Sequence, residues 1–226
     1  MKPMIISFSG IDGAGKSTQI QKLREYLSSN GIAVEELTFW DNVALFSSMR
    51  SGFSRRVLQS DGNVGTPDRP AERRDKNKQN IFLITGRCVL HIFDVLNLRR
   101  IFHQARSRNT GAVIFDRYIY DQLAALPLNS VITRAYARFI LKLAPKPDLA
   151  LLLDAIPEVA RARKPEYPLD FMRQYRSSYL RLCDFTNLRL IRAGEVDEVQ
   201  TAIRAHLDGL RSTASADNEL QTALPA

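Results

Sequence analysis

A glycine-rich segment near the N-terminus has the spacing of a phosphate-binding loop. Residues 10–17 read GIDGAGKS and match the pattern G-x-x-x-x-G-K-[ST], directly after an apolar run and directly before a helical pattern. Glycines let such a loop curl so that its backbone N–H groups point at phosphate oxygens, and the helix N-terminus adds its positive dipole end. Lys16 is expected to reach the β- and γ-phosphates of a nucleoside triphosphate, and Ser17 to place its hydroxyl on Mg²⁺. The expected nucleotide-binding residues are Gly10, Asp12, Gly13, Ala14, Gly15, Lys16, Ser17 and Thr18.

An acid at the end of a second buried strand would support this interpretation. Enzymes with such loops usually use this acid to hold the water shell of the metal ion. Residues 111–116, GAVIFD, form an apolar run that ends at Asp116, and Arg117 follows. Asp116 could instead cap a helix, while Asp154, at the end of another apolar run, could compete for the metal or cap the helix that begins near Pro157. Asp116 is the second metal ligand that we predict.

Strands and helices that alternate along the chain must position these residues. We predict strands at 4–9, 33–39, 111–116, 148–153 and 188–191, and helices at 16–29, 79–108, 130–143, from 157 onward and at 196–210. Two prolines in the segment 164–169 interrupt the helix that begins at Pro157, which is typical of a lid. Alternation of this kind predicts an α/β fold, a five-stranded parallel sheet with helices on both faces.

Length and composition indicate one domain. The chain has 226 residues, of which 45% are hydrophobic, so a single substantial core is expected over residues 1–211. The Ser- and Ala-rich residues 212–226 are predicted to be a disordered tail, and residues 60–78 a mobile charged loop. No apolar run is long enough for a membrane span, and the first residues leave no room for a signal peptide. We therefore expect no membrane partner and a cytoplasmic location.

The net charge of +8 fits either a nucleic-acid surface or a pocket for phosphorylated small molecules. Arginines cluster at 50–56, 69–74, 99–108 and 161–164, and no tract has the low complexity of a nucleic-acid-binding tail. This distribution favours the phosphate pocket over nucleic acid as the partner.

Three segments resemble the thymidylate kinase family, one of the nucleoside monophosphate kinases. They are FSGIDGAGKSTQ at 8–19, VIFDRYIYDQLA at 113–124 and LLLDAIPEVARARK at 151–164, and the match in order and spacing extends from about residue 4 to 210. The resemblance implies a three-layer P-loop NTPase fold with a five-stranded parallel sheet and a short lid that closes over ATP. It also implies a homodimer.

The resemblance assigns roles to individual residues. Asp12 matches the acidic loop position that faces the 3′-hydroxyl of the acceptor sugar. Asp116 and Arg117 match an Asp-Arg pair near the metal and the transferring phosphoryl group. Arg87 looks like the helix arginine that contacts the acceptor nucleotide, and Phe82 could either stack on its base or pack in the core.

The loop also indicates where a catalytic arginine should come from. Gly13 stands where some family members carry that arginine, so the resemblance implies that the lid supplies one. Arg161 and Arg163 are placed to do so, and Lys164 could assist or could be part of a solvated basic helix face. Such an arginine would neutralise charge on the γ-phosphoryl oxygens.

The acceptor side departs from the family pattern. Residues 38–46 read TFWDNVALF where the family has a Glu-Pro-Gly-Gly-type turn with an arginine for the acceptor phosphate nearby. Tyr120, Asp121 and Gln122 follow the Asp-Arg pair, where the family offers small hydroxyl residues and a glutamine.

Other residues could supply the contacts to the acceptor nucleotide that these departures remove. Arg74, with Arg69 and Arg73, could bind the acceptor phosphate, since guanidinium groups suit phosphate oxygens, or could belong to a solvated loop. Trp40 follows a strand whose C-terminal end should face the cleft, so it could contact the acceptor or simply pack.

The sequence thus predicts transfer of a phosphoryl group from ATP to a nucleoside monophosphate, with Mg²⁺ and with dTMP as the favoured acceptor. The alternatives are a P-loop kinase for another small metabolite and a non-catalytic ATP-binding regulatory protein.

Overall fold

The computed structural model describes residues 2–44 and 81–223, with side chains at 2–44 and 88–210. A five-stranded sheet forms the centre, and all of its neighbouring strands are parallel, in the order β2-β3-β1-β4-β5. The strands are β1 Met4–Ser9, β2 Val34–Thr38, β3 Ala112–Asp116, β4 Leu149–Asp154 and β5 Leu188–Arg192. These bounds agree with the predicted strands to within one or two residues.

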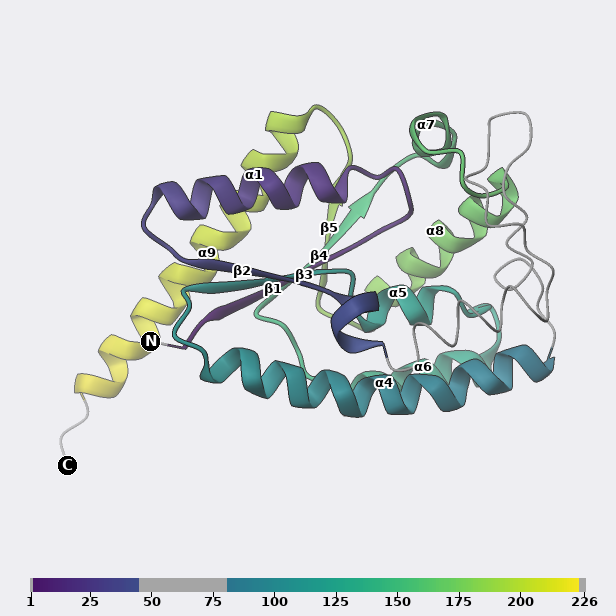
Figure 1. Cartoon of the computed structure of the whole chain (residues 1–226), viewed down its shortest axis with the longest axis horizontal. Coiled ribbons are helices and arrows are strands. Elements are labelled where there is room, and N and C mark those ends of the chain that lie inside the picture. The colour runs from purple at the N-terminus through teal and green to yellow at the C-terminus, as the bar shows by residue number, and fades with distance from the viewer. Residues whose placement is uncertain (1, 45–80, 224–226) are drawn as a thin grey trace.

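Helices cover both faces of the sheet. They are α1 Lys16–Ser29, α4 Ile81–Ser107, α5 Ile119–Ala124, α6 Val131–Leu143, α7 Pro157–Arg163, α8 Leu169–Cys183 and α9 Val196–Ala223, with one π-helical turn, η1 Phe39–Val43. Helices α1 and α9 lie on one face, and α4, α5 and α6 lie on the other (Figure 1). The predicted three-layer α/β fold is confirmed.

Burial along the strands follows from this layering. The central strands β1, β3 and β4 are covered on both faces and are almost wholly apolar, as is usual for parallel sheets. The edge strand β2 buries only Leu37, and its glutamates pair with arginines, Glu35 with Arg108, directly after α4, and Glu36 with Arg24 of α1. Charged side chains on an edge strand also discourage pairing with another chain.

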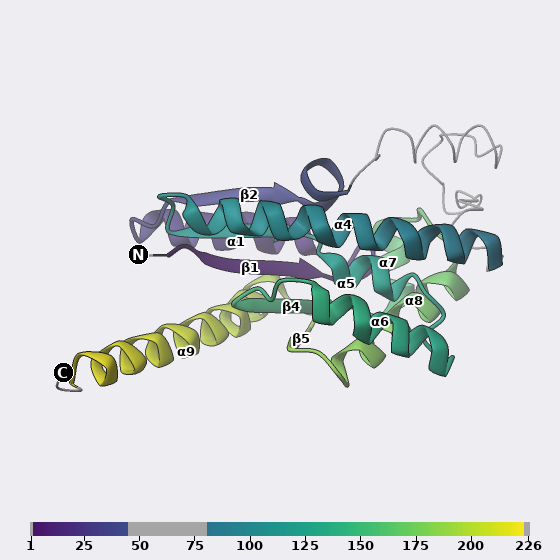
Figure 2. The ribbon, with the colours of Figure 1, turned by 90° about the horizontal axis from the view of Figure 1, so that it is seen from below.

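The carboxyl ends of the strands meet at one edge of the sheet. The register pairs Phe8 of β1 with Asp116 of β3 and Ser9 of β1 with Leu152 of β4. The loops that follow these strands therefore share one edge, the usual ligand-binding edge of such sheets. Figure 2 shows α7 and α8 toward this end and the two chain termini at the opposite end.

The lid segment interrupts the helical path as predicted. Pro157 occupies the first turn of α7, which ends at Arg163, and α8 begins again at Leu169. Proline fits the first helical turn because its missing N–H has no partner there. The charged loop 60–78 lies outside the described residues.

Two helices differ from the prediction. Helix α5 was not predicted, because its six residues are too short to show a helical period. Helix α9 continues to Ala223, whereas we predicted a helix to 210 and a disordered tail at 212–226. Residues 211–223 contain no proline or glycine, so nothing in that stretch stops the helix.

No helix in the described parts of the chain is long and apolar enough to cross a bilayer.

Candidate active site

The phosphate loop lies between β1 and α1 and rests directly on β4. Gly10 has φ 143°, and a Cβ atom there would lie 2.6 Å from the carbonyl oxygen of Leu153. Only glycine combines this backbone conformation with such a close approach. The loop ends at Gly15, the N-cap of α1, so the unpaired N–H groups and positive dipole end of that helix adjoin it.

Lys16 lies inside the loop and is 7% exposed. Its Nζ donates to the carbonyl oxygens of Gly10, at 2.9 Å, and Ile11, at 3.0 Å. Burial lowers the pKa of Lys16 to about 8, and the positive charge of Arg117 acts in the same direction. Nearby carboxylates oppose both effects, so the ammonium group is poised for a negatively charged ligand.

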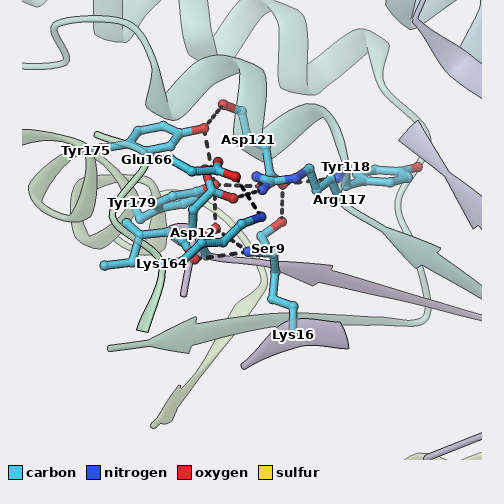
Figure 3. Close-up of polar contacts among 12 residues, drawn as sticks. Ser9, Asp12, Lys16, Arg117, Tyr118, Asp121, Lys164, Glu166, Tyr175 and Tyr179 are labelled. Carbon is cyan, nitrogen blue, oxygen red and sulfur yellow. Dashed lines mark hydrogen bonds and ion pairs between the residues drawn. The ribbon is translucent and has the colours of Figure 1, made fainter. Parts of the chain in front are cut away.

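Arg117 joins the loop to the end of β3. Its backbone has φ 70°, a left-handed conformation that is uncommon for residues other than glycine, and its N–H donates to the carbonyl of Phe8 at 2.9 Å. Nη2 pairs with Asp12 of the loop, and Nη1 donates to Oδ1 of Asp121 at 3.1 Å (Figure 3). Burial alone would lower the pKa of Arg117, but these two carboxylates raise it well above its ordinary value. The guanidinium group is therefore charged and held from two sides.

Asp116 carries a carboxylate oxygen that lacks a protein partner. Among the described residues, its buried Oδ1 has no hydrogen-bond partner. Burial raises the pKa of Asp116, while the positive charges of Arg117 and Lys16 oppose that shift. A buried acceptor without a partner is costly, and a cation or its bound water would satisfy it. Ser17, exposed in the first turn of α1, adds a hydroxyl to a donor set that suits Mg²⁺.

Helix α7 of the lid lies against the phosphate loop. A Cβ atom at Gly13 would be 2.2 Å from the carbonyl oxygen of Ala160 and 2.8 Å from its carbonyl carbon. No side chain fits at this loop position while the lid has this placement. The last turn of α7 carries Arg161, which is half-buried, and Arg163, which is exposed. Lys164, directly after the helix, pairs with Glu166 at 3.1 Å.

Ion pairs connect α7 and the end of β4 to α8. Arg176 binds both carboxylate oxygens of Asp154, with Nε at 2.5 Å and Nη2 at 2.8 Å. Arg173 pairs with Glu158 of α7 at 2.6 Å. The carboxylate of Asp154 is thus engaged by an arginine, and the N-cap of α7 is Ile156, so Asp154 does not cap that helix.

The predicted acceptor residues are only partly within the described structure. Trp40 is half-buried in η1, with its ring edge-on to that of Phe39 at 5.9 Å, and η1 packs against α4. Phe82 and Arg87 lie in the first two turns of α4, but their side chains are outside the described residues, as is Arg74. Of the predicted site residues, the structure brings Asp12, Lys16, Asp116 and Arg117 close to one another.

Sequence reasoning missed a polar network beneath Arg117. Asp121 is 2% exposed and accepts hydrogen bonds from Ser9 and Tyr179, both at 2.7 Å. Tyr175 donates to the backbone carbonyl of Asp121, also at 2.7 Å. Asp121 was noted only as a departure from a family pattern, and Tyr175 and Tyr179 follow an ordinary helical spacing, so the sequence carried no signal for their role.

The fold and this arrangement define a class of protein. The first strand of a parallel sheet runs into a glycine-rich loop with a buried lysine, and the next strand in the sheet ends in an acid beside the loop. This is the organisation of a P-loop nucleotide-binding protein.

Comparison with known proteins identifies the family. The chain is 30% identical over 206 residues to a protein of Methanobrevibacter smithii named "Probable thymidylate kinase", which covers 89% of this chain and 92% of the relative. A protein of the same name from Archaeoglobus fulgidus is 27% identical over 208 residues, 89% of this chain and 93% of the relative. No family model matches the chain. The chain belongs to the thymidylate kinase family.

A solved structure agrees with the architecture. Thymidylate kinase from Candida albicans aligns with a TM-score of 0.63 over 93% of each chain, at 18% sequence identity. At that identity the likeness concerns the fold.

Proposed function

We propose that this protein transfers the γ-phosphoryl group of ATP to a nucleoside monophosphate, with dTMP as the acceptor, giving ADP and dTDP in the presence of Mg²⁺. Membership of the thymidylate kinase family supports the proposal. The observation that carries it is the grouping of Lys16, Arg117, Asp12 and Asp116 at the end of a phosphate loop. Two cations beside a strand-end carboxylate suit a reaction that depends on positioning and on charge neutralisation.

The donor half of the site would bind ATP through the loop. Backbone N–H groups of Gly10–Thr18 would hold the phosphates, and Lys16 would exchange its bonds to loop carbonyls for bonds to the β- and γ-phosphates. Ser17 and Asp116 would hold Mg²⁺, and this role would satisfy the unpartnered Oδ1 of Asp116. The ion supplies charge neutralisation at the phosphates.

The lid would supply the catalytic arginine. The carbonyl of Ala160 occupies the space that a side chain at Gly13 would need, so the loop itself cannot provide one. Arg161 and Arg163 lie on the same short helix as Ala160 and are the candidates that the lid offers. An arginine beside the γ-phosphate would stabilise its charge in the transition state, and the lid would exclude water.

The acceptor would approach from the side of Asp12 and Arg117. The described hydrogen bonds use one N–H on each terminal nitrogen of Arg117, so a second N–H on each is left for a phosphate oxygen. Asp12 would face the 3′-hydroxyl of the acceptor sugar. Trp40, Phe82, Arg87 and Arg74 are our proposed contacts to the rest of the acceptor nucleotide.

We also propose that the protein is a homodimer. Helix α4 exposes Val89, Ile92, Phe93 and Leu96, each between 37% and 56% accessible, at spacings that place them on one helical face. Burying a continuous apolar face of this kind against a second copy is more favourable than leaving it exposed to water. Light scattering should give the mass of a dimer, and Phe93→Glu should shift that mass to a monomer.

A nucleotide panel tests the proposed reaction. ADP release should depend on Mg²⁺ and on an added mononucleotide, with dTMP giving the highest kcat/KM. Absence of acceptor-dependent turnover with every mononucleotide would overturn the proposal.

A further inference from the structure

We propose that Asp121 is the positioning residue for Arg117, fixing the orientation of its guanidinium group for the acceptor phosphate. The inference rests on the proposed kinase function and adds a residue to it. Asp121 lies on α5, a turn after Arg117, and its carboxylate accepts a hydrogen bond from Ser9, the residue directly before the phosphate loop. It acts through Arg117 and not on the substrate.

Each carboxylate oxygen of Asp121 accepts two hydrogen bonds. Oδ1 accepts from Nη1 of Arg117 at 3.1 Å and from the hydroxyl of Tyr179 at 2.7 Å. Oδ2 accepts from the hydroxyl of Ser9 at 2.7 Å and from the backbone N–H of Tyr118 at 3.1 Å. The donors come from β1, the β3–α5 connection and α8, so these bonds fix the carboxylate relative to three parts of the fold (Figure 3).

Because Asp121 is buried, its carboxylate depends on these hydrogen bonds. A carboxylate that is 2% exposed is stable only when it is paired and fully hydrogen-bonded. Removing its charge leaves Arg117 with Asp12 as its single described carboxylate partner. Asp12 belongs to the phosphate loop, which would contact the reacting phosphates, whereas the carboxylate of Asp121 is held by donors outside the loop. Asp121 therefore gives Arg117 a second support from outside the loop.

The backbone of Arg117 explains why such support is needed. A left-handed arginine costs conformational energy and persists only when surrounding contacts determine it. The N–H of Arg117 is tied to β1, and its side chain turns back toward α5 and the loop. With both ends held, the guanidinium group is pre-organised, and phosphoryl transfer depends strongly on such positioning.

The Asp121→Asn variant tests the inference directly. Asparagine has nearly the same shape, but its NH₂ group must face either Arg117 and Tyr179 or Ser9 and the Tyr118 amide, and each pair contains an N–H group that can only donate. We expect kcat/KM for dTMP to fall by roughly 10- to 100-fold, as when an outer partner that orients a site group is lost. ATP affinity, measured by calorimetry, should fall much less than the acceptor kcat/KM, because no residue of the loop itself is replaced.

A matched control separates positioning from stability. Ser178 is also buried, on α8, and its hydroxyl donates to the Leu126 carbonyl at 3.2 Å without contact to Arg117. Ser178→Ala should lower the melting temperature but leave both kinetic constants unchanged. Wild-type kcat and acceptor KM in Asp121→Asn, with only a lower melting temperature, would overturn the inference.

A milder variant covers the case in which Asp121→Asn does not fold. Tyr179→Phe removes the 2.7 Å donor to Oδ1 and two longer contacts of the same hydroxyl, to the Gly10 carbonyl at 3.5 Å and to Tyr175 at 3.4 Å, and it leaves Arg117 in place. We expect acceptor kcat/KM to fall by about fivefold, the size of one lost hydrogen bond, with a smaller change in ATP affinity. No change in that ratio would contradict the inference. If the unmodified enzyme turns over no mononucleotide, the proposed function fails first, and this inference fails with it.

Discussion

The proposed donor side of the site and its proposed acceptor side are built in different ways. The donor side is one continuous segment, Gly10–Ser17, whose shape depends on glycine conformations and on a helix N-terminus. The proposed acceptor side combines side chains from three separate segments of the chain, namely Asp12 of the loop, Trp40 of η1, and Arg117 with Asp121 after β3. The donor side thus depends mainly on backbone, and the acceptor side depends on side chains.

This difference explains where the chain departs from its family. A backbone-built loop tolerates few changes, because a side chain at Gly10 or Gly13 would meet another backbone segment. Side-chain contacts can be exchanged singly, provided that each buried charge keeps its partners. The chain accordingly keeps the loop pattern and replaces residues around Arg117.

The largest expected effect comes from the lid, whose arginines would act on the phosphates that the donor side binds. The double variant Arg161→Ala/Arg163→Ala should lower kcat by about 10³-fold or more, the lower end for arginine fingers. Single-turnover kinetics should show the loss in the chemical step. Arg189→Ala, an exposed arginine on β5, should be neutral. Normal kcat in the double variant would remove the lid from the mechanism.

Lys16→Ala tests the donor side at the loop. Loss of a buried ammonium group aimed at the phosphates should lower kcat by about 10²- to 10³-fold. Circular dichroism should show a retained fold. Lys22→Ala, on the exposed face of α1 where Lys22 pairs with Asp197, should stay near wild type. Near-normal turnover in Lys16→Ala would mean that the donor site is wrongly assigned.

Two glycine variants test whether contact with the backbone of α7 shapes the phosphate loop. Gly13 and Gly15 share positive φ values, 83° and 90°, but a Cβ atom meets the lid backbone only at Gly13. Gly13→Ala should therefore lower the free energy of unfolding by about 1–3 kcal/mol more than Gly15→Ala. Urea denaturation measures both. Equal losses would show that α7 does not press on the loop.

The smallest expected effect concerns the acceptor side. Trp40→Ala should raise the KM for dTMP by about fivefold, since one aromatic contact is worth roughly 1 kcal/mol, and should leave the KM for ATP unchanged. Phe139→Ala removes an exposed aromatic ring on α6 and serves as control. An equal rise in both KM values would show that Trp40 supports the fold and not the acceptor.

Much of the fold was predictable because its signals are local. The apolar runs of β1, β3 and β4, the proline at the start of α7 and the loop motif all depend on neighbouring residues. Helix α5 was missed because a single short turn has no period, and the network around Asp121 was missed because its donors are distant in sequence. The helical continuation of α9 past 210 was missed because composition alone was used there.

The sequence alone determined the alternation of strands and helices, the phosphate loop and the acid at Asp116, since spacing and residue type specify local backbone geometry. Tertiary structure decided the rest: that Ala160 closes over Gly13, that Arg176 takes the carboxylate of Asp154, and that Asp121 holds Arg117. These contacts join residues that no local pattern connects. Folding buries charged groups, which then need hydrogen-bonding partners from elsewhere in the chain. Folding also brings distant backbone segments into contact, which leaves room there for glycine alone.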